Sequence, residues 1–217
     1  HIEEWIQIFL NGRGLPAQDL LPPGIFGYQS GPEGMNHQVY DWDEIAGKAQ
    51  RKSIQVARQL LAEAGYPGGK DANGNPLILY FDTYWTGAAA KARLDWLRKQ
   101  FSRLYIDLQI RQSDYNRFRD KVQQGNFQIL FWGWNADYPD PENFLFLLYG
   151  PNGKARHGGE NVSNYDNPEF DRLFVQMESM QNGVERLELL GRTMDIARRD
   201  APWIWGYYPI SFGLYHD

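Results

Sequence analysis

The segment from Leu77 to Trp134 constrains the fold more than any other part of the chain, because apolar runs alternate there with amphipathic helical patterns. Apolar runs of strand length occur at 77–81, 106–110 and 127–134. Amphipathic helical patterns separate them, at 88–104 and 114–123. Crossovers of this length join parallel strands by right-handed connections. The pattern therefore predicts an α/β fold with a central, mostly parallel or mixed sheet flanked by helices.

Two loops rich in aromatic residues follow strands of this predicted sheet. One loop contains Tyr84 and Trp85, and the other follows the third strand, which is apolar from 127 to 134 and typical of a strand buried on both faces. Open α/β sheets bind ligands at the carboxyl ends of their strands, which meet at one edge. The predicted ligand site comprises Tyr84, Trp85, Trp132, Trp134, Asn135, Asp137 and Tyr138.

Three carboxylates follow the third strand, and two of them have a structural explanation. Asp140 is a good helix N-cap, Pro141 has the φ favoured at the first helical position, and Glu142 complements the helix dipole. Asp137 has no such role, because it precedes the predicted helix and lies among aromatic residues. An anion in such surroundings needs a cation, which is either part of a ligand or an arginine of the same chain.

Composition argues against several partners and chemistries. The 217 residues suffice for one well-buried domain or two small ones, and we expect one. A net charge of −5 without any basic run makes nucleic acid an unexpected partner. With no Cys and four scattered His, we expect no disulfide, no metal and no cofactor. Aromatic residues at 15% exceed what such a core needs, so some are expected on a binding surface.

The two ends of the chain differ from its middle. Residues 1–45 are predicted to contain an amphipathic helix that ends near Gly12, then a long Pro- and Gly-rich loop and a turn capped between Asp41 and Glu44. Further amphipathic helices are predicted at 53–65, from 168 onward and at 184–199.

No apolar run is long enough to cross a bilayer, and no export signal is visible. Because the chain opens on His1, we expect a processed product or an excised piece.

Four motifs in a fixed order resemble one family. They are RQLLAEAGYPGG at 58–69, WNADYPDP at 134–141, SNYDNPEFDRL at 163–173 and DAPWIWGYYP at 200–209. In this order they resemble the large periplasmic solute-binding proteins of peptide ABC importers, the oligopeptide- and dipeptide-binding group of extracellular solute-binding family 5. The opening FLNGRGLPAQDLLPPG, at 9–24, resembles the start of that family's second ligand-enclosing lobe.

The resemblance implies a periplasmic-binding-protein-like lobe. Residues 1–217 are then a single lobe, the C-terminal ligand-enclosing lobe of a larger two-lobed protein, in which 1–45 form a helix and long loop and 203–217 form a strand returning to the absent N-terminal lobe. The implied partners are that lobe, an oligopeptide or other small solute, and the membrane permease of an ABC importer. The implied location is periplasmic or extracellular, with a lipoprotein anchor and an export signal outside this sequence.

In that family the Asp of the Trp-x-Ala-Asp loop pairs with the free α-amino group of the ligand, and Asp137 occupies that position here. One departure concerns the strand before the loop. Some peptide binders carry an Arg there for the ligand carboxylate, whereas this chain has Leu130, Phe131 and Trp132. The other ligand classes of the family, which are sugars, opines and metal chelates, therefore stay open beside peptides.

Two other functions fit the same residues. A hydrolase could use Asp137 with Asp140 or Glu142 as its acid and base, although a glycosidase needs two facing carboxyl groups whose pKa values are pushed apart. An interaction module could instead use the aromatic loops to bind another protein. Of these three functions, we expect the non-catalytic binding lobe, because capping already explains Asp140.

Overall fold

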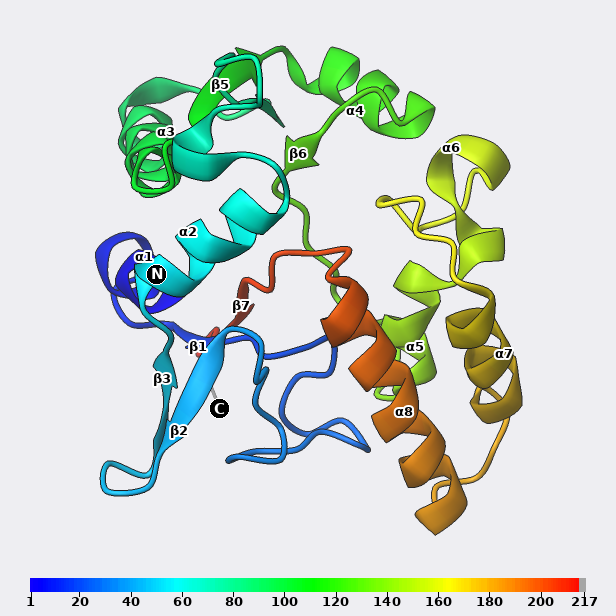
Figure 1. Ribbon diagram of the computed structural model, residues 1–217. Helices are drawn as coiled ribbons and strands as arrows, with labels where there is room; N and C mark the ends of the chain where they lie inside the picture. Colours follow the sequence, from blue (N-terminus) through cyan, green and yellow to red (C-terminus); the bar gives the residue numbers. More distant parts are fainter. Residues whose placement is uncertain (215–217) are drawn as a thin grey trace. The chain divides into compact units, whose positions relative to one another are not determined.

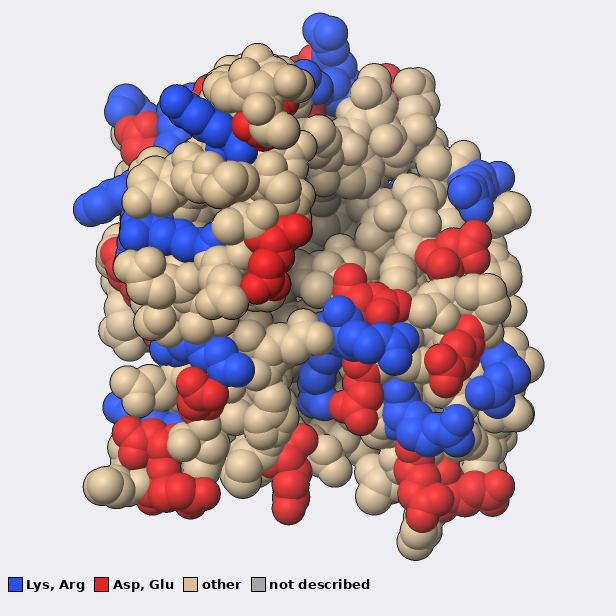
Figure 2. Space-filling view, viewed as in Figure 1, with Lys and Arg blue, Asp and Glu red and all other residues tan. Residues whose placement is uncertain are grey.

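The computed structural model describes residues 1–214 and contains two compact units (Figure 1). The second unit comprises Lys52–Trp134 and is inserted into the first, which comprises His1–Arg51 and the chain from Asn135 onward. Within the described residues, no helix has the length and apolar character needed to span a bilayer. Figure 2 shows acidic and basic side chains intermixed on the face drawn there.

The second unit is the α/β part predicted from the alternating pattern. Its elements are α2 (Ile54–Glu63), η1 (Pro67–Gly69), β4 (Ile78–Thr83), α3 (Gly87–Ser102), β5 (Asp107–Gln112), α4 (Tyr115–Gln124) and β6 (Ile129–Leu130). The strands form one sheet in the order β5-β4-β6, and both pairings are parallel. The predictions of an α/β fold and of one sheet holding all three apolar runs are therefore confirmed.

The two faces of this sheet carry different side chains. Phe81 of β4 is buried in a core cluster with Leu94 of α3 and Leu108 of β5. Successive side chains of a strand point to opposite faces, so Asp82 points away from that cluster. Asp82 forms an ion pair with Lys121 of α4. Helices α3 and α4 thus cover opposite faces of the sheet, as right-handed crossovers at the two sides of β4 require.

The prediction of a doubly buried strand from 127 to 134 is wrong. Only Ile129–Leu130 is paired, and both residues are half-buried. Phe131 and Trp132 are 38% and 42% exposed. The reason is that β6 lies at the edge of the sheet, where β4 is its one neighbour, and the chain leaves the sheet after Leu130. The apolar run therefore supplies exposed aromatic rings as well as a strand.

The first unit combines helices with two short antiparallel strand pairs. Its elements are α1 (Ile2–Leu10), β1 (Gly14–Pro16), β2 (Tyr40–Asp43), β3 (Lys48–Arg51), α5 (Glu142–Leu145), η2 (Phe146–Leu148), η3 (Gly150–Asn152), α6 (Lys154–His157), α7 (Pro168–Met177), α8 (Val184–Asp200) and β7 (Tyr207–Pro209). Helices α7 and α8 bury Phe170, Phe174, Leu190 and Met194 at 2% exposure or less. The predicted helices at both ends of the chain are therefore confirmed.

The β2–β3 hairpin was not predicted from the sequence. The residues from Asp41 to Glu44 were expected to cap a short turn, and Asp43 does so, because its Oδ1 accepts hydrogen bonds from the N–H groups of Ile45 and Ala46. The strands on both sides of this turn were not expected. The flanking strands are four residues each and charged at several positions, so they lack the apolar alternation of a half-buried strand.

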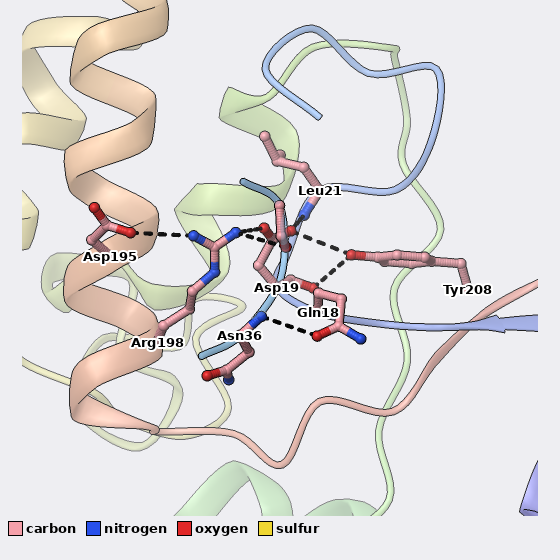
Figure 3. A network of polar contacts seen from close by, with 8 residues as sticks. Gln18, Asp19, Leu21, Asn36, Asp195, Arg198 and Tyr208 are labelled. Carbon is pink, nitrogen blue, oxygen red and sulfur yellow. Dashed lines mark hydrogen bonds and ion pairs between the residues drawn. The ribbon is translucent and has the colours of Figure 1, made fainter. Parts of the chain in front are cut away.

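The long Pro- and Gly-rich loop is anchored to α8 and β7 by a buried polar network (Figure 3). Asp19, 5% exposed, forms an ion pair with Arg198 of α8. Tyr208 donates a hydrogen bond from its hydroxyl to the Asp19 carbonyl, at 2.8 Å. Burial raises the pKa of Asp19 even though Arg198 acts to lower it. The network fixes the loop, and β1–β7 pairing fixes the extended segment near residue 208.

Within the expected segment 203–217, only Tyr207–Pro209 forms a strand, β7, which pairs with β1 in the antiparallel sense, and residues 215–217 lie outside the described residues. The assignment of 1–217 as a single lobe, with a helix and loop at 1–45 and a returning strand at 203–217, stays a prediction.

Candidate functional site

The loop that carries Asp137 belongs to the first unit, and a hydrogen bond from the backbone of Asp137 fixes its position. Residues 135–139 are exposed, and α5 follows within a few residues. The N–H group of Asp137 donates a hydrogen bond to Oδ1 of Asn143, at 2.9 Å. Asn143 lies on α5 and is 4% exposed. The position of the Asp137 backbone is therefore set by a buried side chain, while the Asp137 carboxylate lies at the surface.

Asp140 ends this loop and is neutralised within the chain. Its two carboxylate oxygens accept hydrogen bonds from the guanidinium of Arg186, at 2.8 and 2.7 Å, and Oδ1 also accepts from the N–H group of Glu142, at 2.9 Å. Partial burial acts to raise the pKa of Asp140, but the hydrogen bonds from Arg186 and Glu142 outweigh it, so the pKa lies below its usual value. Asp140 was predicted to be the N-cap residue, with Pro141 first in the helix. In the structure Asp140 does accept the N–H group of Glu142, but α5 begins at Glu142, so the N-cap position falls on Pro141, one residue later than predicted.

Glu142 and Tyr138 interact with each other. The hydroxyl of Tyr138 donates a hydrogen bond to Glu142 Oε2. This bond to a carboxylate raises the pKa of Tyr138, and the amide of Asn143, which also bonds to Tyr138, acts in the opposite direction. The contact draws Tyr138 toward the first turn of α5 and occupies one oxygen of Glu142.

Asp137 itself has no ion pair among the described residues of the first unit. The sequence left open that Asp137 forms a salt bridge with an arginine of the same chain. Within this unit it does not, and Arg186 pairs with Asp140 instead. An exposed carboxylate on a backbone that is fixed by hydrogen bonding is suited to receive a cationic group.

The aromatic residues of the second unit gather at one edge of its sheet. Tyr84 and Trp85 follow β4, and Trp132 follows β6, so parallel pairing puts them at the same edge, as predicted. Ring centroids are 5.5 Å apart for Trp85 and Phe131, and 6.3 Å apart for Phe118 and Trp132. Tyr84 contacts Phe118 at 5.1 Å. The edge therefore presents two groups of rings: Trp85 with Phe131, and the exposed Tyr84 and Trp132 on either side of the buried Phe118.

The seven predicted site residues are divided between the units. Tyr84, Trp85, Trp132 and Trp134 lie in the second unit, and Asn135, Asp137 and Tyr138 lie in the first. Because Trp134 and Asn135 are consecutive, the boundary between the units falls inside the predicted loop. The part these seven residues take in ligand binding stays a prediction.

Sequence reasoning missed four residues that shape these surroundings. Asn143 and Arg186 fix the Asp137 loop, and Phe118 and Tyr115 of α4 extend the aromatic set. Tyr115 and Phe118 are three residues apart, a spacing that puts them on one helical face and could have been noticed. No local signal links Arg186 to Asp140, because 46 residues separate them. In residues 1–214, no group of three or more acidic or His side chains is placed to hold a metal ion.

Solved structures share this architecture. The periplasmic binding protein DppA from Helicobacter pylori, in complex with the peptide STSA, is 23% identical and superposes with a TM-score of 0.76 over 96% of this chain and 36% of its own. HbpA2 from Haemophilus parasuis is 19% identical, with a TM-score of 0.76 over 96% of this chain and 37% of its own. The fold is therefore that of a part of the periplasmic binding proteins.

The family follows from the sequence. Residues 2–156 match the bacterial extracellular solute-binding proteins, family 5 Middle, and the chain belongs to this family. Heme-binding protein A of Haemophilus influenzae is 27% identical over 95% of this chain, and the periplasmic oligopeptide-binding protein OppA of Salmonella typhimurium is 26% identical over 94%. The chain spans 34% of the length of each of these two relatives. The family resemblance inferred from the four motifs is confirmed.

Proposed function

We propose that this chain is the C-terminal, substrate-binding lobe of an ABC-transporter solute-binding protein that captures peptides or peptide-like solutes for import. The observation that carries the proposal is the difference between two neighbouring carboxylates. Asp140 is partly buried and bound by Arg186, whereas the carboxylate of Asp137 is exposed on a fixed backbone without an ion pair in its unit. Because hydrogen bonding fixes its backbone and no cation among the described residues of its unit pairs with it, the Asp137 carboxylate is available to a cationic group of a ligand.

The proposed partner of Asp137 is the free α-amino group of the ligand. A carboxylate paired with an ammonium gives orientation as well as attraction, so it fits a binder that must accept different side chains. Asn135 and Tyr138 would add polar contacts, and Trp132, Trp134, Tyr84 and Trp85 would add aromatic ones. Relatives named for oligopeptides and for di- and tripeptides support this ligand class.

Other relatives favour a wider range of ligands. One is named for heme and another for deoxycholate, and neither is a peptide. Leu130, Phe131 and Trp132 also supply no cation for a ligand carboxylate. The proposal therefore rests on the ligand amine at Asp137 and leaves the rest of the ligand to be determined by experiment.

The remaining parts of the proposal concern the longer protein. The missing N-terminal lobe would close over the ligand with this one, and the closed form would meet the membrane permease of the importer. Relatives described as periplasmic support a location in the periplasm or at the outer face of the membrane, with a lipid anchor outside this sequence.

A hydrolase is a weaker candidate. It would need Asp140 or Glu142 as a proton donor opposite Asp137. Asp140 is held ionised by Arg186, with a lowered pKa, and a general acid requires a raised one. An interaction module that uses the exposed rings of the second unit differs from the proposed function in its partner, which would be a protein.

The test compares a free-amine peptide with its N-acetyl form, using calorimetry on the full-length protein that contains this chain. Removing one partner of a desolvated charge pair costs about 3 to 5 kcal/mol. Asp137→Ala should therefore weaken binding of trialanine to penta-alanine by about a hundredfold or more, and N-acetylation should weaken wild-type binding comparably. The two losses should not add, because they remove the same pair.

Three outcomes would count against the proposal. If Asp140→Ala abolishes binding with unchanged stability while Asp137→Ala has no effect, the cap and the ligand residue have been exchanged. If neither acetylation nor Asp137→Ala matters, the ligand carries no amine at Asp137. If the chain hydrolyses a peptide or glycoside and Asp137→Asn abolishes turnover, the protein is an enzyme.

A further inference from the structure

The hydrogen bond between Asp137 and Asn143 links the proposed ligand residue to the interior of the first unit. Asn143 is 4% exposed, and its Oδ1 accepts the N–H group of Asp137 at 2.9 Å across six residues of chain. Burying an amide side chain is unfavourable unless its polar atoms are bonded, so the structure holds Asn143 in a defined orientation. That orientation in turn fixes the Asp137 backbone.

The next residue of the loop is also tied to the start of α5. The Tyr138 hydroxyl donates a hydrogen bond to Glu142, the residue before Asn143. Two successive loop residues are therefore bound to α5, Asp137 through its backbone and Tyr138 through its side chain. The carboxylate of Asp137 takes no part in these contacts and stays available at the surface.

The far end of the loop is fixed independently. Asp140 is bound at both oxygens by Arg186, which is 2% exposed and also donates from Nε to the carbonyl of Met177, at 3.1 Å. With Asp140 held by α8 and Asp137 held by Asn143, the segment between them has little conformational freedom. A ligand then binds without the entropic cost of ordering this loop.

We propose that Asn143 is a positioning residue for ligand binding: it holds the Asp137 backbone so that the Asp137 carboxylate is presented to a ligand ammonium group. This inference rests on the proposed function of Asp137, because it concerns how that carboxylate is aimed. It assigns Asn143 no direct contact with the ligand.

The test measures amine discrimination, which is the affinity for a free-amine peptide divided by the affinity for its N-acetyl form. Trialanine to penta-alanine and their N-acetyl forms serve as probes on the full-length protein that contains this chain. Asn143→Leu removes the acceptor at similar size, and discrimination should fall about tenfold, as expected for one hydrogen bond to a buried partner. Asn143→Asp keeps an acceptor oxygen and should restore discrimination to within about threefold of wild type.

Asn36 provides a matched control. It is 3% exposed, lies in the same unit, and its Oδ1 accepts the N–H group of Gln38 at 3.1 Å. Asn36→Leu should lower the melting temperature much as Asn143→Leu does, because each leaves one backbone N–H without its acceptor, but it should leave amine discrimination unchanged. If Asn143→Leu does not fold, Asn143→Ala removes the same acceptor without added bulk.

The possible outcomes separate the inference from the function on which it rests. If wild-type protein discriminates and the Asn143 variants without an acceptor discriminate equally well, Asn143 is structural only and the inference is wrong. If both Leu variants lose discrimination equally, the loss reports general destabilisation and again overturns it. If wild-type protein shows no discrimination, or binds none of these peptides, the proposed function fails and the inference falls with it.

Discussion

The guanidinium of Arg186 and the carboxylate of Asp140 form a two-point ion pair, with Nη1 2.8 Å from Oδ2 and Nη2 2.7 Å from Oδ1. Arg186 is 2% exposed, whereas the Asp140 side chain is 32% exposed. The pair joins the loop after the second unit to α8, so it ties two segments of the first unit that are distant in sequence. Because Arg186 pairs with Asp140, the neighbouring carboxylate of Asp137 has no ion pair among the described residues of the first unit.

Deleting the carboxylate of this pair should destabilise the protein strongly. Asp140→Ala leaves the Arg186 guanidinium buried without its counter-charge, which costs about 3 to 5 kcal/mol in the free energy of unfolding. Urea denaturation measures the change. Asp166→Ala is the control, because Asp166 and Arg156 form an exposed pair, 54% and 68% accessible, whose loss should cost less than about 1 kcal/mol. Equal costs for the two variants would contradict the prediction.

The stability supplied by Asp140 should depend on pH in a defined direction. Its pKa in the folded protein is lowered, so its contribution is fully present above the unfolded value of about 3.9 and is lost as the pH falls through the lower folded value. Unfolding free energies of wild type and Asp140→Asn should therefore differ most at pH 5 to 7 and converge in stronger acid. A difference that grows on acidification would show that the sign is wrong.

The ion pair in the second unit should respond asymmetrically to mutation. Lys121→Met leaves Asp82, 1% exposed, as a buried carboxylate without a cation, and should cost about 3 to 5 kcal/mol. Asp82→Asn should cost less, about 1 to 3 kcal/mol, because Lys121 is 21% exposed and can be hydrated. Thermal or urea unfolding distinguishes the two. Lys91→Met breaks an exposed pair with Asp95 and should cost under about 1 kcal/mol.

Two adjacent glycines at the end of the LAEAGYPGG motif should differ in tolerance. Both have positive φ, 62° at Gly68 and 75° at Gly69, so alanine is strained at either by about 1 to 2 kcal/mol. A Cβ at Gly69 would also lie 2.2 Å from the carbonyl oxygen of Tyr105, whereas a Cβ at Gly68 meets nothing within 4 Å. Gly69→Ala should therefore cost at least about 1 to 3 kcal/mol more than Gly68→Ala in unfolding experiments. Similar losses for the two variants would contradict the predicted clash.

Local pattern was sufficient for the sheet of the second unit. The alternation of apolar runs and amphipathic helices between Leu77 and Trp134 predicted three strands in one sheet, because the length of each crossover leaves parallel pairing as the solution. The helical pattern at 114–123 was also predicted, and the structure forms α4 there, beginning after the N-cap Asp114 and ending at Gly125 in the left-handed conformation. Pattern failed at β6, where an apolar run turned out to be an edge strand followed by exposed rings.

The candidate site, like the sheet, was predicted from local residue patterns only in part. Residue types predicted that Asp140 is a cap and that Asp137 needs another explanation, since capping is a local interaction encoded within three residues. The insertion of residues 52–134 between two parts of the first unit has no local signature, because it depends on which distant segments pack together.

The sequence by itself determined the α/β class, the positions of the longer helices to within about two residues and the family, since these depend on periodicity, capping residues and short motifs. Only the tertiary structure decided which carboxylate is neutralised. Arg186 lies 46 residues from Asp140, and it is brought to Asp140 by the packing of α8 against the rest of the first unit. Asp137 and Asp140 are three residues apart and chemically identical, and what distinguishes them is the placement of one buried guanidinium.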